Sequence, residues 1–228
     1  MTGPAPNGLH RRVRSFVRRP GRLTPAQQRA LDTNLPDWSV DPELVDLRCA
    51  FASKAPLVVE IGFGNGEALA FMAAHEPEKH FVGIEVHEPG VGGLLQTLVQ
   101  QELDNVRIAM RDAVEVLENQ VAPASLAQVR IYFPDPWPKK RHHKRRLIQK
   151  DFVERIAECL VPGGLLHLAT DWAPYADWML ETVDRCRGFN NLGNPWIARP
   201  AWRPQTRFER RGLGRGHEIF DLLYERSG

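Results

Sequence analysis

The sequence predicts one α/β domain in which a mostly parallel sheet carries helices on both of its faces. The chain has 228 residues, which is enough for one well-buried domain and does not require a second. From about residue 40 onward, short apolar runs alternate with stretches of helical pattern. This alternation is typical of parallel strands that are joined by crossover helices.

Strands and helices are expected in regular succession. The predicted strands are residues 57–61, 80–86, 106–110, 129–133 and 165–169, with a last strand at 217–224. The predicted helices are residues 66–75, 90–103, 112–120, 149–160 and 173–187. Pro162, Gly163 and Gly164 predict a sharp turn that ends the fourth helix and leads into the fifth strand.

The first 35 residues differ in composition from the rest of the chain. They are rich in Arg, Pro, Gly and Gln and lack a sustained apolar periodicity. We therefore expect a basic, flexible N-terminal arm over residues 1–35 that becomes ordered on binding. The folded domain is expected to span residues 36–228.

Positive charge is concentrated in two segments. Residues 1–30 contain seven arginines and no acid, and residues 139–150 contain seven lysines and arginines, two histidines and no acid. Because the whole chain has a formal charge of +2, the remaining residues carry −12. This segregation favours a polyanionic partner held at defined places, although two solvated charge runs would have the same composition.

Membrane, secreted and metal-binding classes are not expected. No stretch approaches the roughly 20 apolar residues that cross a bilayer, and the N-terminus is polar and basic where a signal peptide would be apolar. We therefore expect a cytoplasmic protein without membrane association. Cys49, Cys159 and Cys186 are too far apart for a zinc knuckle or a redox pair, so we interpret them as buried thiols and expect no metal.

A glycine-rich turn follows the first predicted strand. The strand leads through Glu60 into Gly62, Gly64 and Gly66, and glycines let the backbone turn tightly and approach a ligand. Glu67 stands where a dinucleotide-binding motif has its third glycine, and no Gly-Lys-Ser/Thr sequence ends the loop. An adenosine ligand without phosphates therefore fits better than NAD or a nucleoside triphosphate.

Acidic residues follow the next two predicted strands. Glu85 lies about 20 residues beyond the turn, where an acid can bind ribose hydroxyls, and Asp112 could reach the adenine amino group. A glycine triplet also occurs in ordinary tight turns, but the two acids favour a cofactor site. The arrangement resembles class I S-adenosylmethionine methyltransferases. This resemblance implies a pocket lined by Glu60, Gly62, Gly64, Gly66, Glu85 and Asp112, with Glu60 near the methionine end of the cofactor.

A rigid segment framed by prolines follows the fourth predicted strand. Pro134, Pro136 and Pro138 restrict the backbone around Asp135 and Trp137. The carboxylate and the indole would thus be held in a fixed pose at the carboxyl edge of the sheet. The basic segment begins next to this position, which suits phosphate binding beside a reacting centre; a rigid turn with a solvated loop is the alternative interpretation.

The segment from Pro134 to Arg146 resembles the hallmark of the tRNA (guanine-N7-)-methyltransferase family. Residues 14–22, 83–92, 170–172 and 206–212 are similar to further elements of that family. The resemblance implies a Rossmann-like class I fold, with a seven-stranded sheet whose last strand is antiparallel. It also implies S-adenosyl-L-methionine as cofactor, S-adenosyl-L-homocysteine as product, and methylation of guanine N7 in tRNA at variable-loop position 46.

The resemblance and the charge pattern together assign roles to further residues. Asp135 is the expected catalytic residue and an additional cofactor contact. The expected substrate-binding residues are Lys139, Asp171, Thr206, Arg207, Phe208 and Glu209. Contacts to the RNA backbone are expected from Arg18, Arg19, Arg22, Lys140, Arg141, Lys144, Arg145 and Arg146. The chain is expected to act without an obligatory protein partner, as a monomer or homodimer.

The chemistry at guanine N7 requires positioning more than proton removal. N7 has a free lone pair, so in-line placement of the two reacting atoms is the main requirement. Methylation brings positive charge to the purine, which a nearby carboxylate stabilises. We assign this role to Asp135.

Two alternative functions remain open at this point. A methyltransferase for another nucleobase position, such as an exocyclic amine, would usually have two adjacent prolines after the acid, and Asp135-Pro136-Trp137 has one. An RNA-binding module that has lost catalysis would have a broken glycine turn or a missing cofactor acid, and both features are intact. Without the family resemblance, Asp171 and Glu209 would be interpreted as surface acids.

Overall fold

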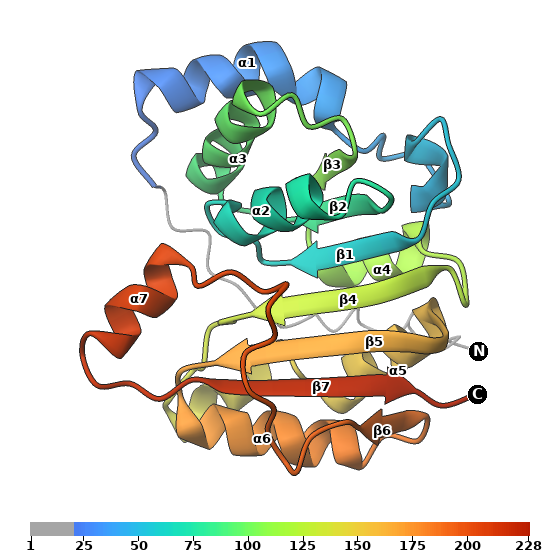
Figure 1. Cartoon of the computed structure of the whole chain (residues 1–228), viewed down its shortest axis with the longest axis vertical. Helices are drawn as coiled ribbons and strands as arrows, with labels where there is room; N and C mark the ends of the chain where they lie inside the picture. Colours follow the sequence, from blue (N-terminus) through green and yellow to red (C-terminus); the bar gives the residue numbers. More distant parts are fainter. Residues whose placement is uncertain (1–20) are drawn as a thin grey trace, which may run out of the picture.

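The computed structural model describes residues 21–228 and contains a seven-stranded sheet (Figure 1). The strands are β1 (Leu57–Ile61), β2 (His80–Ile84), β3 (Val106–Ala109), β4 (Leu126–Tyr132), β5 (Leu160–Thr170), β6 (Phe189–Asn191) and β7 (Phe220–Arg226). Their order in the sheet is β3-β2-β1-β4-β5-β7-β6. Strands β1 to β5 pair in parallel, whereas β7 is antiparallel to both of its neighbours. The mostly parallel sheet with an antiparallel last strand is thus confirmed.

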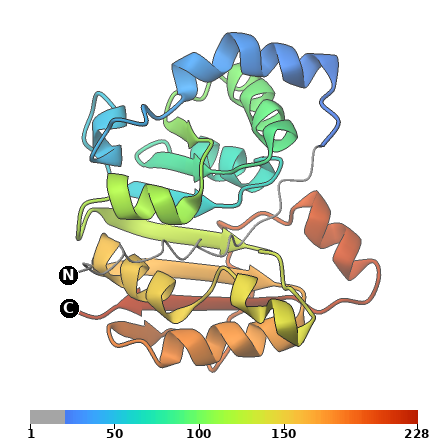
Figure 2. The ribbon, with the colours of Figure 1, turned by 180° about the vertical axis from the view of Figure 1, so that it is seen from behind.

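Helices cover both faces of the sheet (Figures 1 and 2). One face carries α1 (Pro25–Trp38), α2 (Glu67–His75) and α3 (Glu88–Gln100), and the other carries α4 (Ala113–Gln120), α5 (Lys150–Cys159) and α6 (Ala173–Asp184). Alternate residues of β1 belong to the two cores, with Val59 and Ile61 in one and Val58 in the other. The central strands are mostly apolar because both faces are buried.

The helix α7 (Arg207–Leu213) belongs to neither layer. It lies beside the carboxyl ends of the parallel strands, close to the start of α2 (Figure 1). Two short 3₁₀ helices, η1 (Leu47–Ala50) and η2 (Lys140–Arg145), complete the described elements. The sequence patterns predicted neither α7 nor the short edge strand β6.

The boundary predicted at residue 35 differs from the structure. Residues 25–35 belong to α1, which begins with a capping box between Thr24 and Gln27 and packs on α3. The Gln27 side chain donates to the Pro89 carbonyl oxygen over 3.0 Å, and a Cβ at Gly92 would lie 2.9 Å from Gln27. The described part of the predicted arm is therefore packed on the domain from residue 25 onward. Residues 1–20 lie outside the described part of the chain.

The turn predicted at Pro162–Gly164 is also placed differently. Helix α5 ends at Cys159 and β5 begins at Leu160, so these residues lie within the strand. The pairing with β4 moves from Leu160 opposite Leu126 to Leu165 opposite Gln128, which makes the segment a bulge. Gly163 has a φ of 78°, a conformation that glycine adopts without strain.

The cysteines are only partly placed as predicted. Cys159 and Cys186 are buried, whereas Cys49 is exposed. It lies in η1, in which Leu47 is the buried residue, so the prediction of a buried thiol was wrong there. Within residues 21–228, no helix is long and apolar enough to span a membrane.

Candidate functional site

The glycine turn after β1 has the conformation that its sequence predicts. Gly62, Gly64 and Gly66 have φ angles of 74°, 58° and 74°, which lie in the left-handed region that favours glycine. Gly66 also precedes α2 as its N-cap, and a Cβ there would lie 2.6 Å from the Leu94 side chain. The turn therefore requires glycine for its backbone conformation and for its close packing on α3.

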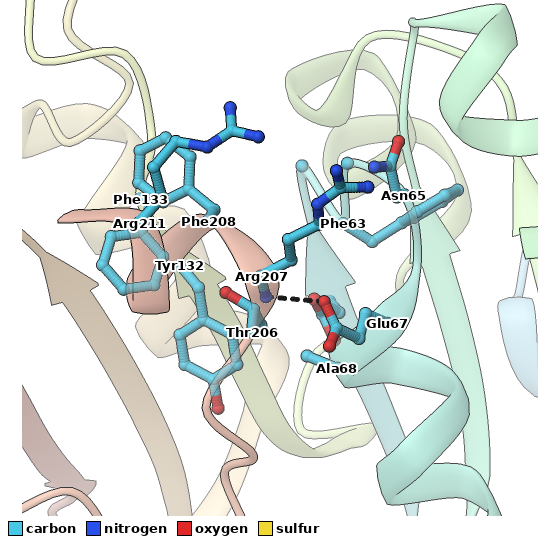
Figure 3. A pocket seen from close by; sticks show the side chains of 13 residues that line it. Phe63, Asn65, Glu67, Ala68, Tyr132, Phe133, Thr206, Arg207, Phe208 and Arg211 are labelled. Atoms are coloured by element: carbon cyan, nitrogen blue, oxygen red, sulfur yellow. Dashed lines mark hydrogen bonds between the residues drawn. The ribbon is translucent and has the colours of Figure 1, made fainter. Parts of the chain in front are cut away.

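A pocket of about 420 Å³ opens beside this turn (Figure 3). One wall is formed by Glu60, the glycine turn and the first turn of α2, and the opposite wall by Tyr132 and Phe133 at the end of β4. The α7 segment closes a third side with Thr206, Arg207, Phe208 and Arg211. The Arg207 backbone N–H donates to Glu67 over 2.7 Å, which joins α7 to α2 across the pocket.

Glu60 contributes a buried carboxyl group to the wall of this pocket. Its side chain is 2% exposed, and the oxygen Oε2 has no hydrogen-bond partner among the described residues. Burial raises the pKa of Glu60 to about 7; nearby Arg130 opposes the rise and Glu85 adds to it. An unpartnered buried carboxylate oxygen at a pocket is suited to a ligand that donates hydrogen bonds or carries positive charge.

A second pocket of about 210 Å³ adjoins the first and shares Gly62 and Phe133 with it. Glu85, Arg111 and Asp135 contribute its polar lining. The Glu85 carboxylate accepts hydrogen bonds from the backbone N–H groups of Gly64, Val86 and His87 at 2.7 to 3.0 Å. Glu85 therefore braces the glycine turn as well as lining the pocket.

Asp112 has a structural role that the sequence interpretation did not include. Its oxygen Oδ1 accepts a hydrogen bond from the Val114 backbone N–H over 2.9 Å, so Asp112 is the N-cap of α4. The residues on either side, Arg111 and Ala113, line the second pocket, whereas Asp112 is not among the lining residues. Contact with an adenine amino group thus stays a prediction.

The proline-framed segment after β4 is tightly constrained. Phe133 and Trp137 have φ angles of 51° and 45°, which are unfavourable for residues with a side chain. Between them Asp135 is exposed at the second pocket. The carbonyl oxygen of Pro136 accepts a hydrogen bond from Arg146 Nε over 2.9 Å. The fixed pose predicted for this loop is therefore supported by a side chain from the end of the basic segment.

Arg146 is buried and differs in this from its predicted role. It is 3% exposed, and its guanidinium carbon lies 4.9 and 5.0 Å from the ring centres of Tyr175 and Trp178. In this position the guanidinium is not offered to solvent, so the contact of Arg146 with an RNA backbone finds no support here and stays a prediction. Its charge instead stabilises the loop through the Pro136 hydrogen bond and cation–π contacts.

The rest of the basic segment is accessible. Lys139, Lys140, Arg141 and Lys144 are exposed, and half-buried Arg145 lies 5.1 Å from the Trp137 ring centre. Arg22 is also exposed. The predicted contacts by Arg18 and Arg19 lie outside the described residues.

The late segments lie at the same edge of the sheet. Asp171 follows β5, and its Oδ2 is 2.9 Å from His217 Nδ1. Thr206 caps α7 by accepting a hydrogen bond from the Glu209 N–H. Phe208 is exposed, and its ring centre lies 5.2 Å from that of Phe133. Thr206, Arg207 and Phe208 thus line the pocket beside the residues that the glycine motif predicted.

Glu209 belongs to a buried network and is not a surface acid. Its two carboxylate oxygens accept hydrogen bonds from Arg203 at 2.6 and 3.1 Å, and Arg203 also binds Asp221 at 2.7 and 2.8 Å. His167 joins Asp221 to the Tyr132 hydroxyl. Burial alone would raise the pKa of Asp221, but hydrogen bonds from His167 and Arg203 hold it below its usual value.

Several lining residues were not predicted from the sequence. They include Phe63, Asn65, Glu67, Arg111, Tyr132, Phe133 and Arg211. Those next to the glycine turn could have been found, because residues that flank such a turn necessarily border its ligand. Arg211 could not, because no local pattern shows that α7 folds back onto the end of β1.

The fold and the two adjoining pockets define a Rossmann-like, class I methyltransferase. A family model described as "Putative methyltransferase" matches residues 54–222. The chain is 54% identical to a tRNA (guanine-N(7)-)-methyltransferase of Halorhodospira halophila, over 94% of this chain and 95% of the relative. It is 50% identical to one of Alcanivorax borkumensis, over 98% and 95% of the two chains. The chain therefore belongs to the tRNA (guanine-N7-)-methyltransferase family.

A solved structure has the same fold at low sequence identity. It is a 16S rRNA (adenine(1408)-N(1))-methyltransferase from Catenulisporales acidiphilia with the cosubstrate SAM. The two chains are 14% identical with a TM-score of 0.53, over 78% of this chain and 88% of that one. At this identity the likeness concerns the fold alone.

Glu60 should make the stability of the ligand-free protein depend on pH. Its folded-state pKa of about 7 lies above the ordinary value of 4.5, so the protonated group favours folding at low pH. That contribution is full below pH 4.5 and is lost as the pH rises through 7, and a pKa difference of this size corresponds to roughly 3 kcal/mol. Urea unfolding at pH 4.5 and 8 should show this loss in the wild type and not in Glu60→Gln.

The matched control for this measurement is Glu43→Gln, which changes an exposed glutamate. It should retain the pH dependence of the wild type. An equal pH dependence in Glu60→Gln and the wild type would contradict the assignment of the raised pKa to Glu60.

Proposed function

We propose that this chain transfers the methyl group of S-adenosylmethionine to N7 of a guanine in tRNA, at variable-loop position 46. The observation that carries this proposal is the arrangement of two adjoining pockets, an exposed carboxylate and an exposed basic loop at one edge of the sheet. The names of the close relatives support the tRNA guanine-N7 reaction. The proposed position rests on the sequence resemblance.

The pockets fit S-adenosylmethionine. When bound, this cofactor supplies an electrophilic methyl group attached to a positively charged sulfur. The unpartnered oxygen of Glu60 suits the amino group at the methionine end, because a buried carboxylate is stabilised by a cationic donor. Glu85 and the apolar lining of the second pocket suit the adenosine part.

Asp135 follows Phe133, a residue that lines both pockets, by two positions in the chain. It lines the second pocket, and the loop that holds it is fixed by prolines and by Arg146. N7 needs no base because its lone pair is free. In our proposal the Asp135 carboxylate accepts hydrogen bonds from the guanine edge and stabilises the positive charge that arises on the purine, and its rigid loop provides the alignment.

The exposed cations beside Asp135 suit a folded RNA. Lys139, Lys140, Arg141 and Lys144 form a surface that can neutralise phosphates without reading sequence. Phe208 offers an exposed ring on which an unstacked base could pack. A guanine in an accessible loop satisfies this geometry better than one in the deep groove of an A-form helix.

Purified protein and unmodified tRNA transcript test the proposed reaction directly. Incubation with labelled S-adenosylmethionine should produce 7-methylguanosine, and fragment mass spectrometry should locate it at position 46. Success with the purified chain alone would also support action without a partner subunit. Methylation of another base or another atom would contradict the proposed reaction, and 7-methylguanosine elsewhere would contradict only the position.

Asp135→Asn should strongly lower turnover while the cofactor still binds. Removing the negative charge withdraws electrostatic stabilisation, and such changes lower kcat by roughly 100- to 1,000-fold. Calorimetry should show an S-adenosylhomocysteine Kd within about threefold of the wild type. Asp177→Asn, an exposed acid on α6, is the control; wild-type kcat in Asp135→Asn would remove Asp135 from the mechanism.

Neutralising the exposed basic loop should reduce the salt dependence of tRNA binding. In the double variant Arg141→Gln and Lys144→Gln, the slope of log K against log salt should fall by about 1.4 to 1.8 if each cation contacts one phosphate. The matched control removes the same charge elsewhere, through Lys54→Gln and Arg185→Gln at exposed positions. A slope equal to that of the wild type would show that the loop does not contact phosphate.

A further inference from the structure

Arg203 connects α7 to the sheet from a fully buried position. It is 0% exposed and lies in the segment between β6 and α7. Its guanidinium makes a bidentate contact with Asp221 at 2.7 and 2.8 Å and another with Glu209 at 2.6 and 3.1 Å. Asp221 pairs with Ala169 at the carboxyl end of β5. One side chain thus joins a core strand to the helix at the mouth of the pocket.

The other contacts that hold helix α7 lie at exposed positions, among them the hydrogen bond from the Arg207 backbone N–H to Glu67 and the packing of the Phe208 ring by Phe133. The helix has seven residues, of which Glu209 and Gly212 are buried, and a helix of this length is not stable alone. Its ion pair between Arg210 and Glu67 is exposed, with side chains 52% and 44% accessible, and exposed pairs contribute little to stability. A planar guanidinium that makes two bidentate contacts fixes orientation as well as distance.

The position of α7 determines one side of the first pocket. Thr206, Arg207, Phe208 and Arg211 all line it, and Glu209 lies in the middle of this segment. Arg203 also lies behind the wall that Tyr132 and Phe133 form. Its guanidinium carbon is 5.6 and 5.8 Å from the ring centres of these two residues. The same side chain therefore supports two walls of the pocket without being among its lining residues.

We propose that Arg203 is a positioning residue that clamps α7 to β7 through Glu209 and Asp221 and thereby closes the pocket around its ligand. The ligand named here, S-adenosylmethionine, rests on the proposed function, whereas the clamp itself does not. Removal of the clamp should release α7 locally and leave the sheet folded. The pocket should then bind its ligand more weakly because one side is open.

Two variants distinguish clamping from general destabilisation. Arg203→Lys keeps the charge but cannot make two bidentate contacts. Arg203→Met alone would leave the buried Glu209 carboxylate unpaired. The double variant Arg203→Met with Glu209→Gln removes this charge, so it should be thermally more stable than Arg203→Met alone. If α7 depends on the clamp, Arg203→Lys should lose the closed position that α7 has in the wild type. The double variant should lack this position too, even though it is more stable than Arg203→Met.

Limited trypsin digestion of the full chain measures the position of α7 directly. Arg207, Arg210 and Arg211 are exposed cleavage sites within the helix, and Arg185 is an exposed site on the far side of the domain. Well below the unfolding temperature, cleavage in α7 relative to cleavage after Arg185 should rise roughly tenfold in both variants. In calorimetry, the Kd for S-adenosylhomocysteine should rise by a similar factor.

The control is Arg155→Met, which removes a largely buried arginine that bridges α5 to the Leu117 and Val121 carbonyls. It should lower the melting temperature without changing the relative cleavage in α7 or the Kd. Unchanged relative cleavage in the Arg203 variants would overturn the clamp, even if the wild type methylates tRNA. If cleavage in α7 increases in the Arg203 variants and the wild type does not methylate tRNA, the clamp is supported and only the proposed function is contradicted.

Discussion

The end of β1 is the constraint on which the rest of the site depends. This strand lies between β2 and β4 and under helices on both faces, so a carboxyl group on it cannot be hydrated from the sides. Glu60 nevertheless occupies the strand with one oxygen unpartnered among the described residues. Such burial is unfavourable unless a ligand compensates for it. The glycine turn that follows leaves the Glu60 carboxyl group accessible to a ligand from one direction, through the pocket.

Two buried arginines hold the loops around this pocket in place. Arg146 fixes the loop of Asp135 through the Pro136 carbonyl and two aromatic rings, and Arg203 joins α7 to β7 through paired carboxylates. Arginine suits both positions because its charge is permanent and its planar group makes several directed contacts at once. In this basic protein, charge therefore has two uses: exposed cations form a surface for a polyanion, and buried ones give the site its shape.

The sequence predicted those parts of the fold and the site that local pattern determines. The central strands are buried on both faces and appear as apolar runs, and the residues at their carboxyl ends, such as Glu60 and Asp135, fall at the pockets. Helix α1 was missed because the residues that pack it on the domain, half-buried Leu31, Leu35 and Trp38, lie on both sides of residue 35, where the arm was predicted to end. The burial of Arg146 and Glu209 was not predicted, because burial of a charged side chain depends on partners distant in sequence, which only the tertiary structure brings together.

The segments that complete the site lie outside the sheet and the helices that cover it. A 16S rRNA methyltransferase has the same fold at 14% identity, and a fold by itself does not define a function. These segments are the loop around Asp135, which lines the second pocket, α7, which lines the first, and the basic helix η2, which lies beside the Asp135 loop in the chain and lines neither. Each is short, and the Asp135 loop and α7 are each held by a buried arginine. Because these anchors lie outside the pocket lining, lining residues can differ between related enzymes without loss of the geometry that positions them.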